Sequence, residues 1–240
     1  MLSVVAASVG AGQPPLLRLY DGATGAFQRE ITAFDGNFAG GVRVAMADFN
    51  ADGIDDVVAA PGPGGGPNVK IFDGSNGHLL DSFWAYNQSF TGGVFVAAAD
   101  VNSDGTPDIV TGADAGGGPH VKVFNGQNHA QLASFYAFNQ TFTGGVRVAA
   151  GDVNNDGKAD IFAAAGPGGG PNVKIFNAAN GNQLDSFWAY NQTFNGGVYI
   201  AAGDTNADGR SEVITGAGPG GGPNVKVFQA PNHTLLSSFY

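Results

Sequence analysis

The sequence contains no cysteine and little positive charge, and each of these absences excludes a class of protein. Without cysteine there is no disulfide framework, no thiol nucleophile and no cysteine-based zinc site. The chain has 10 Lys and Arg against 20 Asp and Glu, which gives a net charge of −10. Because phosphate contacts need clustered basic side chains, this balance argues against a nucleic-acid partner and favours cations.

Long apolar runs and paired histidines are also absent. No run approaches the roughly 20 residues that span a bilayer, so we expect no membrane insertion. Residues 1–10 are apolar but lack a basic start, and they match a repeat strand better than a signal peptide. The four histidines show no metal-ligand spacing and no catalytic triad can be assembled, so we predict that the chain is not an enzyme. These are His78, His120, His129 and His233.

What the sequence does have is glycine and proline in regular clusters. Hydrophobic residues make up 43% of the chain and charged residues 12%, as expected of a globular protein. The 40 glycines and 12 prolines fall in short groups at even spacing, which is typical of turns between strands. The composition therefore predicts an all-β fold.

An internal repeat decides the architecture. The segment 42–45 recurs at residues 94, 146 and 198, so the period is 52 residues without a gap. Within one unit, four strand-like runs are separated by turn residues, and we call these strands A, B, C and D. In the third unit they are 146–151, 160–165, 172–176 and 183–190. Four such strands, repeated, predict a β-propeller of four-stranded antiparallel blades with strand A innermost.

The repeat predicts one β-propeller domain over residues 1–240. It divides into a partial blade and four full repeats: 1–41, 42–93, 94–145, 146–197 and 198–240. The N-terminal part holds only strands B, C and D, so we expect five blades, the first lacking its inner strand. An unpaired strand edge is a liability. Two alternatives stay open: the chain is part of a longer array, or another subunit fills the gap and forms an oligomer.

Between strands A and B, each full repeat carries an acidic loop. Oxygen side chains stand at positions 1, 3, 5 and 9, glycine stands at position 6, and position 7 offers its backbone carbonyl, a set that suits Ca²⁺. Three carboxylates in nine residues would repel one another in an empty turn. We therefore predict about four Ca²⁺ ions, with ordinary Asp and Asn turns as the alternative. The predicted ligands are Asp48, Asn50, Asp52, Ile54, Asp56, Asp100, Asn102, Asp104, Thr106, Asp108, Asp152, Asn154, Asp156, Lys158, Asp160, Asp204, Asn206, Asp208, Arg210 and Glu212.

These loops differ from an EF-hand, which needs a bidentate Glu at position 12. Position 12 here is Ala59, Thr111, Ala163 or Thr215, so the acid at position 9 is the last ligand. Glu212 replaces Asp in the fourth loop, and we expect coordination there to differ.

At this point the chain resembles the FG-GAP repeats of integrin α-subunit propellers and many bacterial surface proteins. The family name describes a Phe-Gly pair before strand A and Gly-Ala-Pro after strand B. Degenerate forms of the first are Phe38–Gly41, Phe90–Gly93, Phe142–Gly145 and Phe194–Gly197, and of the second Ala59–Pro61, Gly112–Asp114, Ala164–Gly166 and Gly216–Gly218. The resemblance implies a propeller with calcium on one face and ligand contacts on the other, and does not imply an enzyme.

The face opposite the acidic loops carries three sets of candidate ligand-binding residues. Arg43, Phe95, Arg147 and Tyr199 begin the inner strands near the mouth of the axis. Polar residues recur at two other repeat positions: Asn68, His120, Asn172 and Asn224 at one, and Asn87, Asn139 and Asn191 at the other. The alternative is that the first set fills the channel and the others close turns.

Together these features predict a non-catalytic, calcium-stabilised binding module of a secreted or cell-surface protein. Glycan is slightly favoured over an extracellular protein as its partner, because amides and nearby aromatics suit sugar hydroxyls. The alternatives are a purely structural spacer in a large surface protein and an accessory domain of a polysaccharide-active enzyme.

Overall fold

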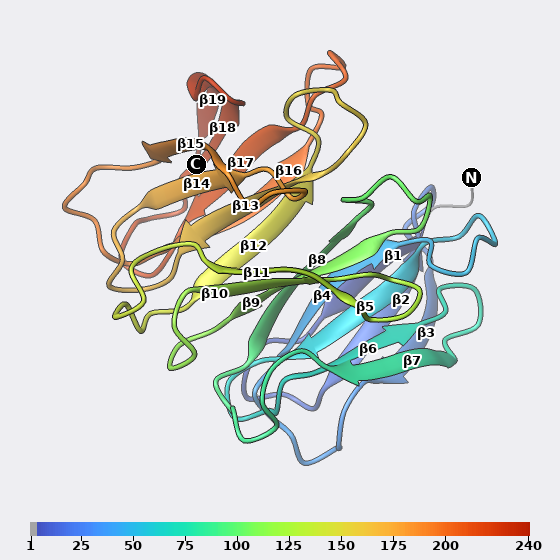
Figure 1. Cartoon of the computed structure of the whole chain (residues 1–240). Coiled ribbons are helices and arrows are strands. Elements are labelled where there is room, and N and C mark those ends of the chain that lie inside the picture. The colour runs from blue at the N-terminus through green and yellow to red at the C-terminus, as the bar shows by residue number, and fades with distance from the viewer. Residues whose placement is uncertain (1–3) are drawn as a thin grey trace.

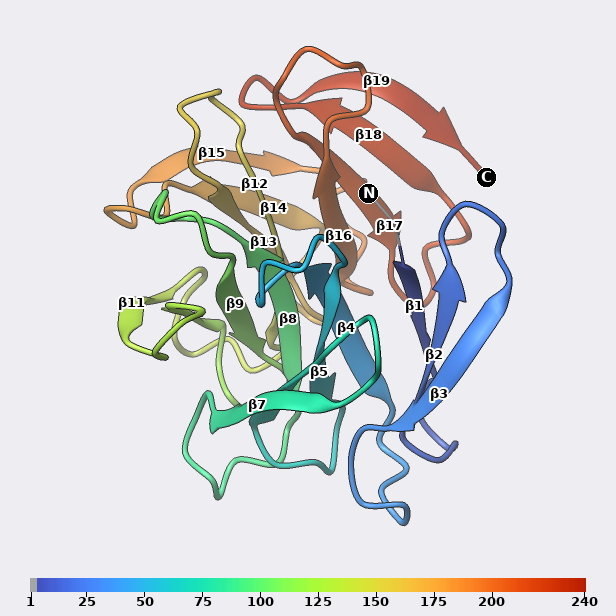
Figure 2. The same ribbon diagram turned by 90° about the vertical axis from the view of Figure 1, so that its right-hand side faces the viewer.

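Five antiparallel sheets surround one axis in the computed structural model of the chain, which describes residues 4–240 (Figure 1). Figure 2 shows β4, β8 and β16 gathered near the centre and β3, β7, β11, β15 and β19 at the rim. No helix occurs among the described residues. The fold is the predicted all-β, five-bladed propeller.

Each sheet is one blade, and the strands follow chain order from the axis outward. The first blade is β1 (Val4–Ser8), β2 (Leu16–Asp21) and β3 (Phe27–Thr32); the second is β4 (Val42–Ala47), β5 (Asp56–Pro61), β6 (Asn68–Phe72) and β7 (Leu79–Trp84). The third is β8 (Val94–Ala99), β9 (Asp108–Ala113), β10 (His120–Phe124) and β11 (Gln131–Tyr136). The fourth is β12 (Val146–Gly151), β13 (Asp160–Ala165), β14 (Asn172–Phe176) and β15 (Gln183–Trp188), and the fifth is β16 (Val198–Gly203), β17 (Glu212–Ala217), β18 (Val225–Gln229) and β19 (Thr234–Phe239).

The predicted strands of the third repeat agree with β12 to β14 at both ends, and β15 ends two residues earlier than expected. The outer strands β7 and β11 end at the same repeat position, and beyond β15 the Tyr190 side chain reaches the next blade. Its hydroxyl donates hydrogen bonds to the backbone oxygens of Thr215, at 3.0 Å, and Asn224, at 2.8 Å.

The first blade has three strands, as predicted, and β1 takes the place of strand B. It pairs with β2 from Val4 opposite Asp21 to Ser8 opposite Leu17. Within residues 4–240, no strand of this blade lies between β1 and the propeller axis. The inner strands of the two adjacent blades, β4 and β16, lie on either side of this position (Figure 2).

The core lies between blades, where strand B of one blade packs against the next. Every residue of β5, β9 and β13 is buried, and apart from the aspartate that begins each strand and Thr111 these residues are apolar. Blades come closest near the axis, and only small residues fit there. At Gly112, for example, an added Cβ would lie 2.4 Å from the backbone oxygen of Val146 in the next blade.

In two places, a tyrosine hydroxyl forms hydrogen bonds between adjacent blades. Besides Tyr190, Tyr86 of the second blade donates to the backbone oxygens of Thr111, at 3.1 Å, and His120, at 2.9 Å, in the third blade. The same repeat position is Phe34 in the first blade and Phe138 in the third, and phenylalanine has no hydroxyl to donate.

Candidate metal-binding loops and the opposite face

The acidic loops between strands A and B are tied by their own carboxylates. In the loop of the fourth blade, Asp152 accepts hydrogen bonds from the backbone N–H groups of Asp156, at 3.3 Å, and Gly157, at 2.8 Å. Asn154 accepts from Asp156 N–H at 2.9 Å, and Asp156 accepts from Lys158 N–H at 2.9 Å. The same pattern recurs in the other loops, so positions 1, 3 and 5 organise the bend at glycine 6.

The acid at position 9 lies at the start of strand B and is buried. Asp56 accepts hydrogen bonds from Phe49 N–H at 2.9 Å and from Gly74 N–H at 3.0 Å. Gly74 belongs to the turn between strands C and D, so this carboxylate joins two turns on one face of the propeller. The corresponding acids of the other loops, Asp108, Asp160 and Glu212, are also buried.

Glu212 makes hydrogen bonds within its loop that the three aspartates do not make. One carboxylate oxygen accepts hydrogen bonds from the N–H and the hydroxyl of Thr205, both at 2.7 Å. The other accepts from the side-chain amide of Asn206 at 3.2 Å. The extra methylene therefore lets position 9 reach position 3 within the same loop.

The donors fit a hard cation in chemistry, because each loop offers only oxygen ligands. Their charges also interact. Burial, together with repulsion from Asp156 and Asp152, raises the pKa of Asp160 to about 6. Burial and repulsion from Asp104 and Asp100 raise the pKa of Asp108 in the same way. Yet no three acidic or histidine side chains converge on one point anywhere in residues 4–240, so calcium stays a prediction.

These raised pKa values predict the pH dependence of the calcium-free protein. A carboxyl with a higher pKa in the folded state than in the unfolded state holds more protons when folded, so stability falls as pH rises. For Asp160 the window runs from 3.8 to about 6. Urea unfolding in EGTA should give a midpoint that decreases across this window. Asp160→Asn should flatten the decrease, and an unchanged slope would contradict the assignment.

On the opposite face, the Phe-Gly motif joins the loop after strand D to the loop after strand B. The Phe142 ring lies against Gly144 and Gly169. A Cβ atom added to Gly144 would come within 2.4 Å of the ring, and one added to Gly169 within 2.6 Å. Gly166 N–H donates to the backbone oxygen of Gly145 at 3.1 Å. Glycine is thus required where the two loops meet.

The polar residues predicted on this face make hydrogen bonds within the fold. The Asn68 amide donates to the Ser82 hydroxyl and to Phe83 O, both at 3.0 Å, and Asn172 and Asn224 make the equivalent bond to the backbone at 3.0 and 3.1 Å. His120 Nε2 lies 2.8 Å from the Ser134 hydroxyl and replaces the amide in the same bond. The remaining set, Asn87, Asn139 and Asn191, accepts hydrogen bonds from the residue two further on.

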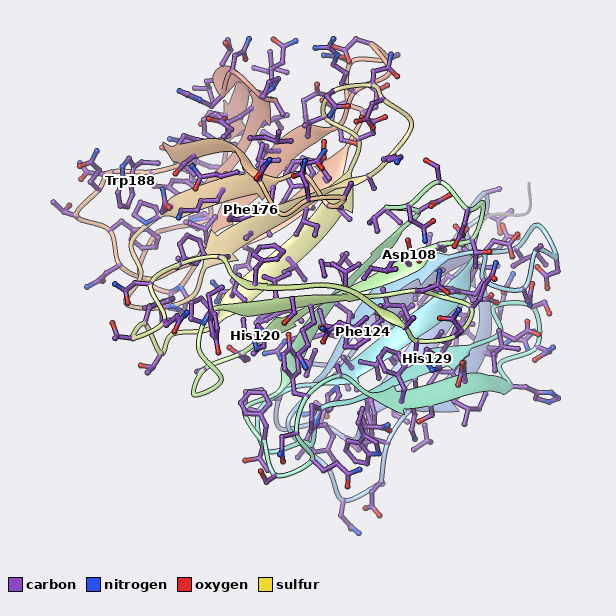
Figure 3. The ribbon with its side chains drawn as sticks, in the orientation of Figure 1. Asp108, His120, Phe124, His129, Phe176 and Trp188 are labelled. Carbon is purple, nitrogen blue, oxygen red and sulfur yellow. The ribbon has the colours of Figure 1, made fainter. Side chains whose placement is uncertain are left out.

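The repeat explains the His120–Ser134 pair as part of a hairpin, since asparagine makes the same contact in other blades. Figure 3 labels His120 and Asp108 at opposite ends of the third blade. No carboxylate of that acidic loop therefore orients this histidine, and the pair is not an assembled catalytic triad.

The four residues at the mouth of the axis form one stack. The Arg43 guanidinium carbon lies 3.7 Å from the centre of the Phe95 ring. The Arg147 guanidinium carbon lies 4.1 Å from the centre of Tyr199 and 5.6 Å from that of Phe95. Arg43 also forms an ion pair with Asp114, which follows strand B of the third blade. The structure therefore brings together the predicted inner-strand residues.

Outer-strand aromatics are more exposed than their predicted role between blades requires. Trp84, Tyr136 and Trp188 are 48%, 44% and 47% exposed. Trp84 lines a cavity of about 240 Å³ together with Phe34, Asp35 and Asn68. For Trp84, Tyr136, Trp188 and Tyr240 the sequence favours packing between blades, which is usual for aromatic residues on outer strands, with stacking on sugars as the alternative.

The fold and the loops define a β-propeller built from repeated acidic hairpins. Residues 48–111, 100–163 and 152–215 each match the FG-GAP-like repeat. These matches span more than half of the chain, which therefore belongs to the FG-GAP-like repeat family. Modules of this family generally bind partners and are typically non-catalytic.

Two solved structures share the fold at low sequence identity. A chain of the mitotic checkpoint complex aligns with a TM-score of 0.62 and 13% identity, over 98% of this chain and 61% of that one. U3-55K aligns with a TM-score of 0.60 and 13% identity, over 99% of this chain and 65% of that one. The chain thus spans less than two thirds of either protein. Within residues 4–240 no apolar helix has the length needed to cross a membrane.

Proposed function

We propose that this propeller is a calcium-stabilised, non-catalytic module that binds glycan through the face opposite the acidic loops. The observation that carries the proposal is the cavity beside Trp84, where an exposed indole ring stands next to Asp35 and Asn68. An aromatic face stacks on the apolar side of a sugar ring, while carboxylate and amide groups bond its hydroxyls.

The repeat places an aromatic residue and a polar residue at the same two positions in other blades. Trp188 and Asn172 hold the same positions in the fourth blade, and Tyr136 and His120 hold them in the third. Each site is small, so a single sugar would bind weakly. A branched or polymeric glycan that reaches two blades gains avidity without further contacts.

Calcium is proposed as a structural ion on the other face. Four Ca²⁺ ions would offset most of the charge of −10 and would bind the loops through position 1, 3, 5 and 9 oxygens and the position 7 carbonyl. Extracellular modules bind calcium at about 10⁻⁴–10⁻³ M. We therefore place the module in a secreted or cell-surface protein, where calcium is abundant enough to fill sites of this affinity.

A glycan array followed by titration calorimetry tests the binding proposal. With the best glycan, Trp84→Ala and Trp188→Ala should each weaken binding, and the double variant should lose about tenfold or more, because stacking is lost at two sites. Leu80→Ala is the control, since this exposed residue lies on the same strand as Trp84. Absence of binding to every glycan would reject the proposal and favour a protein partner or a structural spacer.

A further inference from the structure

The stack at the mouth of the axis holds an unbalanced positive charge. Arg43 and Arg147 both lie in it, and the carboxylate paired with them is that of Asp114. Burial lowers the pKa of both guanidinium groups, and Arg43 further lowers that of Arg147. Guanidinium remains charged in proteins even when buried, so two positive charges face one negative charge.

These two arginines also have more hydrogen-bond donors than partners. Arg147 is only 7% exposed, and its NH1 group donates to the backbone oxygen of Val198 at 3.1 Å. Its Nε atom is buried without a partner, as is the NH1 group of Arg43. Unpaired buried donors are costly unless another group accepts from them. A cluster of this kind favours an added anion.

A cavity of about 290 Å³ opens beside the stack. Arg43 and Tyr199 line it, together with three loop segments: 9–11, 40–42 and 62–63. Tyr199 is 51% exposed, so its ring is free to contact a ligand. Cavities for drug-sized ligands measure about 300–1,000 Å³, so this one suits a single sugar ring rather than a long segment.

We propose that this axial cavity binds the carboxylate of an acidic sugar, a uronate, with Arg43 as the charged contact and Tyr199 stacked on the ring. Arg43 lines the cavity, so its guanidinium can offer a charge-assisted N–H···O bond to a carboxylate, and partial burial strengthens the attraction. Arg147 lies behind Tyr199 and adds positive potential. The inference rests on the proposed glycan binding and adds the chemical class of the glycan.

The test compares digalacturonate with its methyl ester, which lacks the negative charges and carries a methyl group on each carboxyl, by titration calorimetry against the whole chain. The acid should bind more tightly than the ester by about tenfold or more. Arg43→Gln should remove most of this difference. Asp114→Asn should strengthen binding of the acid, because it frees Arg43 from its internal partner. Arg18→Gln is the control, since it removes the same charge from an exposed arginine on β2.

The opposite signs expected for Arg43→Gln and Asp114→Asn separate a binding effect from misfolding, which would weaken binding in both. Equal binding of acid and ester, unchanged by either variant, would overturn the axial site while leaving glycan binding intact. Failure of all sugars to bind would reject both proposals. Binding of a polyglutamate peptide in place of digalacturonate would reject the sugar assignment and point to an acidic protein partner.

Discussion

Removal of calcium with EGTA is expected to lower the unfolding midpoint of this propeller by about 20 °C or more. At a hundredfold excess over its dissociation constant, one bound ligand stabilises the folded state by about 2.7 kcal/mol. Four loops together would contribute about 10 kcal/mol. For a domain of this size each kcal/mol shifts the midpoint by about 2–4 °C. Calorimetry with excess Ca²⁺ and with EGTA measures the difference.

The four loops also supply the control for this experiment. Asp152→Ala removes one ligand from one loop, so it should reduce the calcium-dependent shift by about a quarter if each site contributes equally. Asp185→Asn, on the outer strand β15, should leave the shift unchanged. A midpoint that is the same in calcium and in EGTA would mean that the loops are hydrogen-bonded turns without a structural ion.

Replacement of Phe162 by alanine is expected to destabilise the propeller by about 3–5 kcal/mol. Phe162 lies on β13, is 0% exposed, and contacts the core between the fourth and fifth blades. The substitution removes apolar contacts and leaves a cavity that the close-packed blades cannot fill. Urea unfolding of both proteins in excess calcium gives the difference in free energy.

The residues at the Phe162 position in the other repeats suggest a second, smaller substitution. The same position holds Val58, Val110 or Ile214, so Phe162→Val should cost less than Phe162→Ala. Phe27→Ala, on the exposed side of β3, is the control for loss of a ring from the surface. If Phe162→Ala cost no more than Phe27→Ala, the core between these blades would not contribute as described.

The sequence predicted the blades well because the repeat is nearly free of insertions. A period of 52 residues fixes where each strand begins, and the glycine clusters mark its ends. The three-stranded first blade also followed from the repeat, because the N-terminal part holds only strands B, C and D. Such local patterns predict the blades well because each sheet is made of strands that are consecutive in sequence.

Contacts between distant residues could not be predicted in the same way. Arg43 pairs with Asp114, 71 residues away. Glycine stands at this repeat position in the other full repeats, and the exception does not reveal which residue Asp114 contacts. The backbone at position 4 of each acidic loop was also missed. Ala51, Ser103, Asn155 and Ala207 all have a positive φ of 59–62°, although alanine and serine give no signal for that conformation.

Hydrogen bonds from tyrosine hydroxyls join some adjacent blades and not others. Where Tyr86 and Tyr190 stand, adjacent blades share hydrogen bonds in addition to apolar contact. At Phe34 and Phe138 the seam lacks this hydroxyl. In a protein whose units are coupled mainly to their nearest neighbours, partial opening begins at the least coupled seams. The tyrosine bonds therefore add coupling between the second and third blades and between the fourth and fifth. The third and fourth blades are joined instead by Ala159 N–H donating to Asp100 O at 3.0 Å and the Ser103 hydroxyl donating to Gly157 O at 2.8 Å.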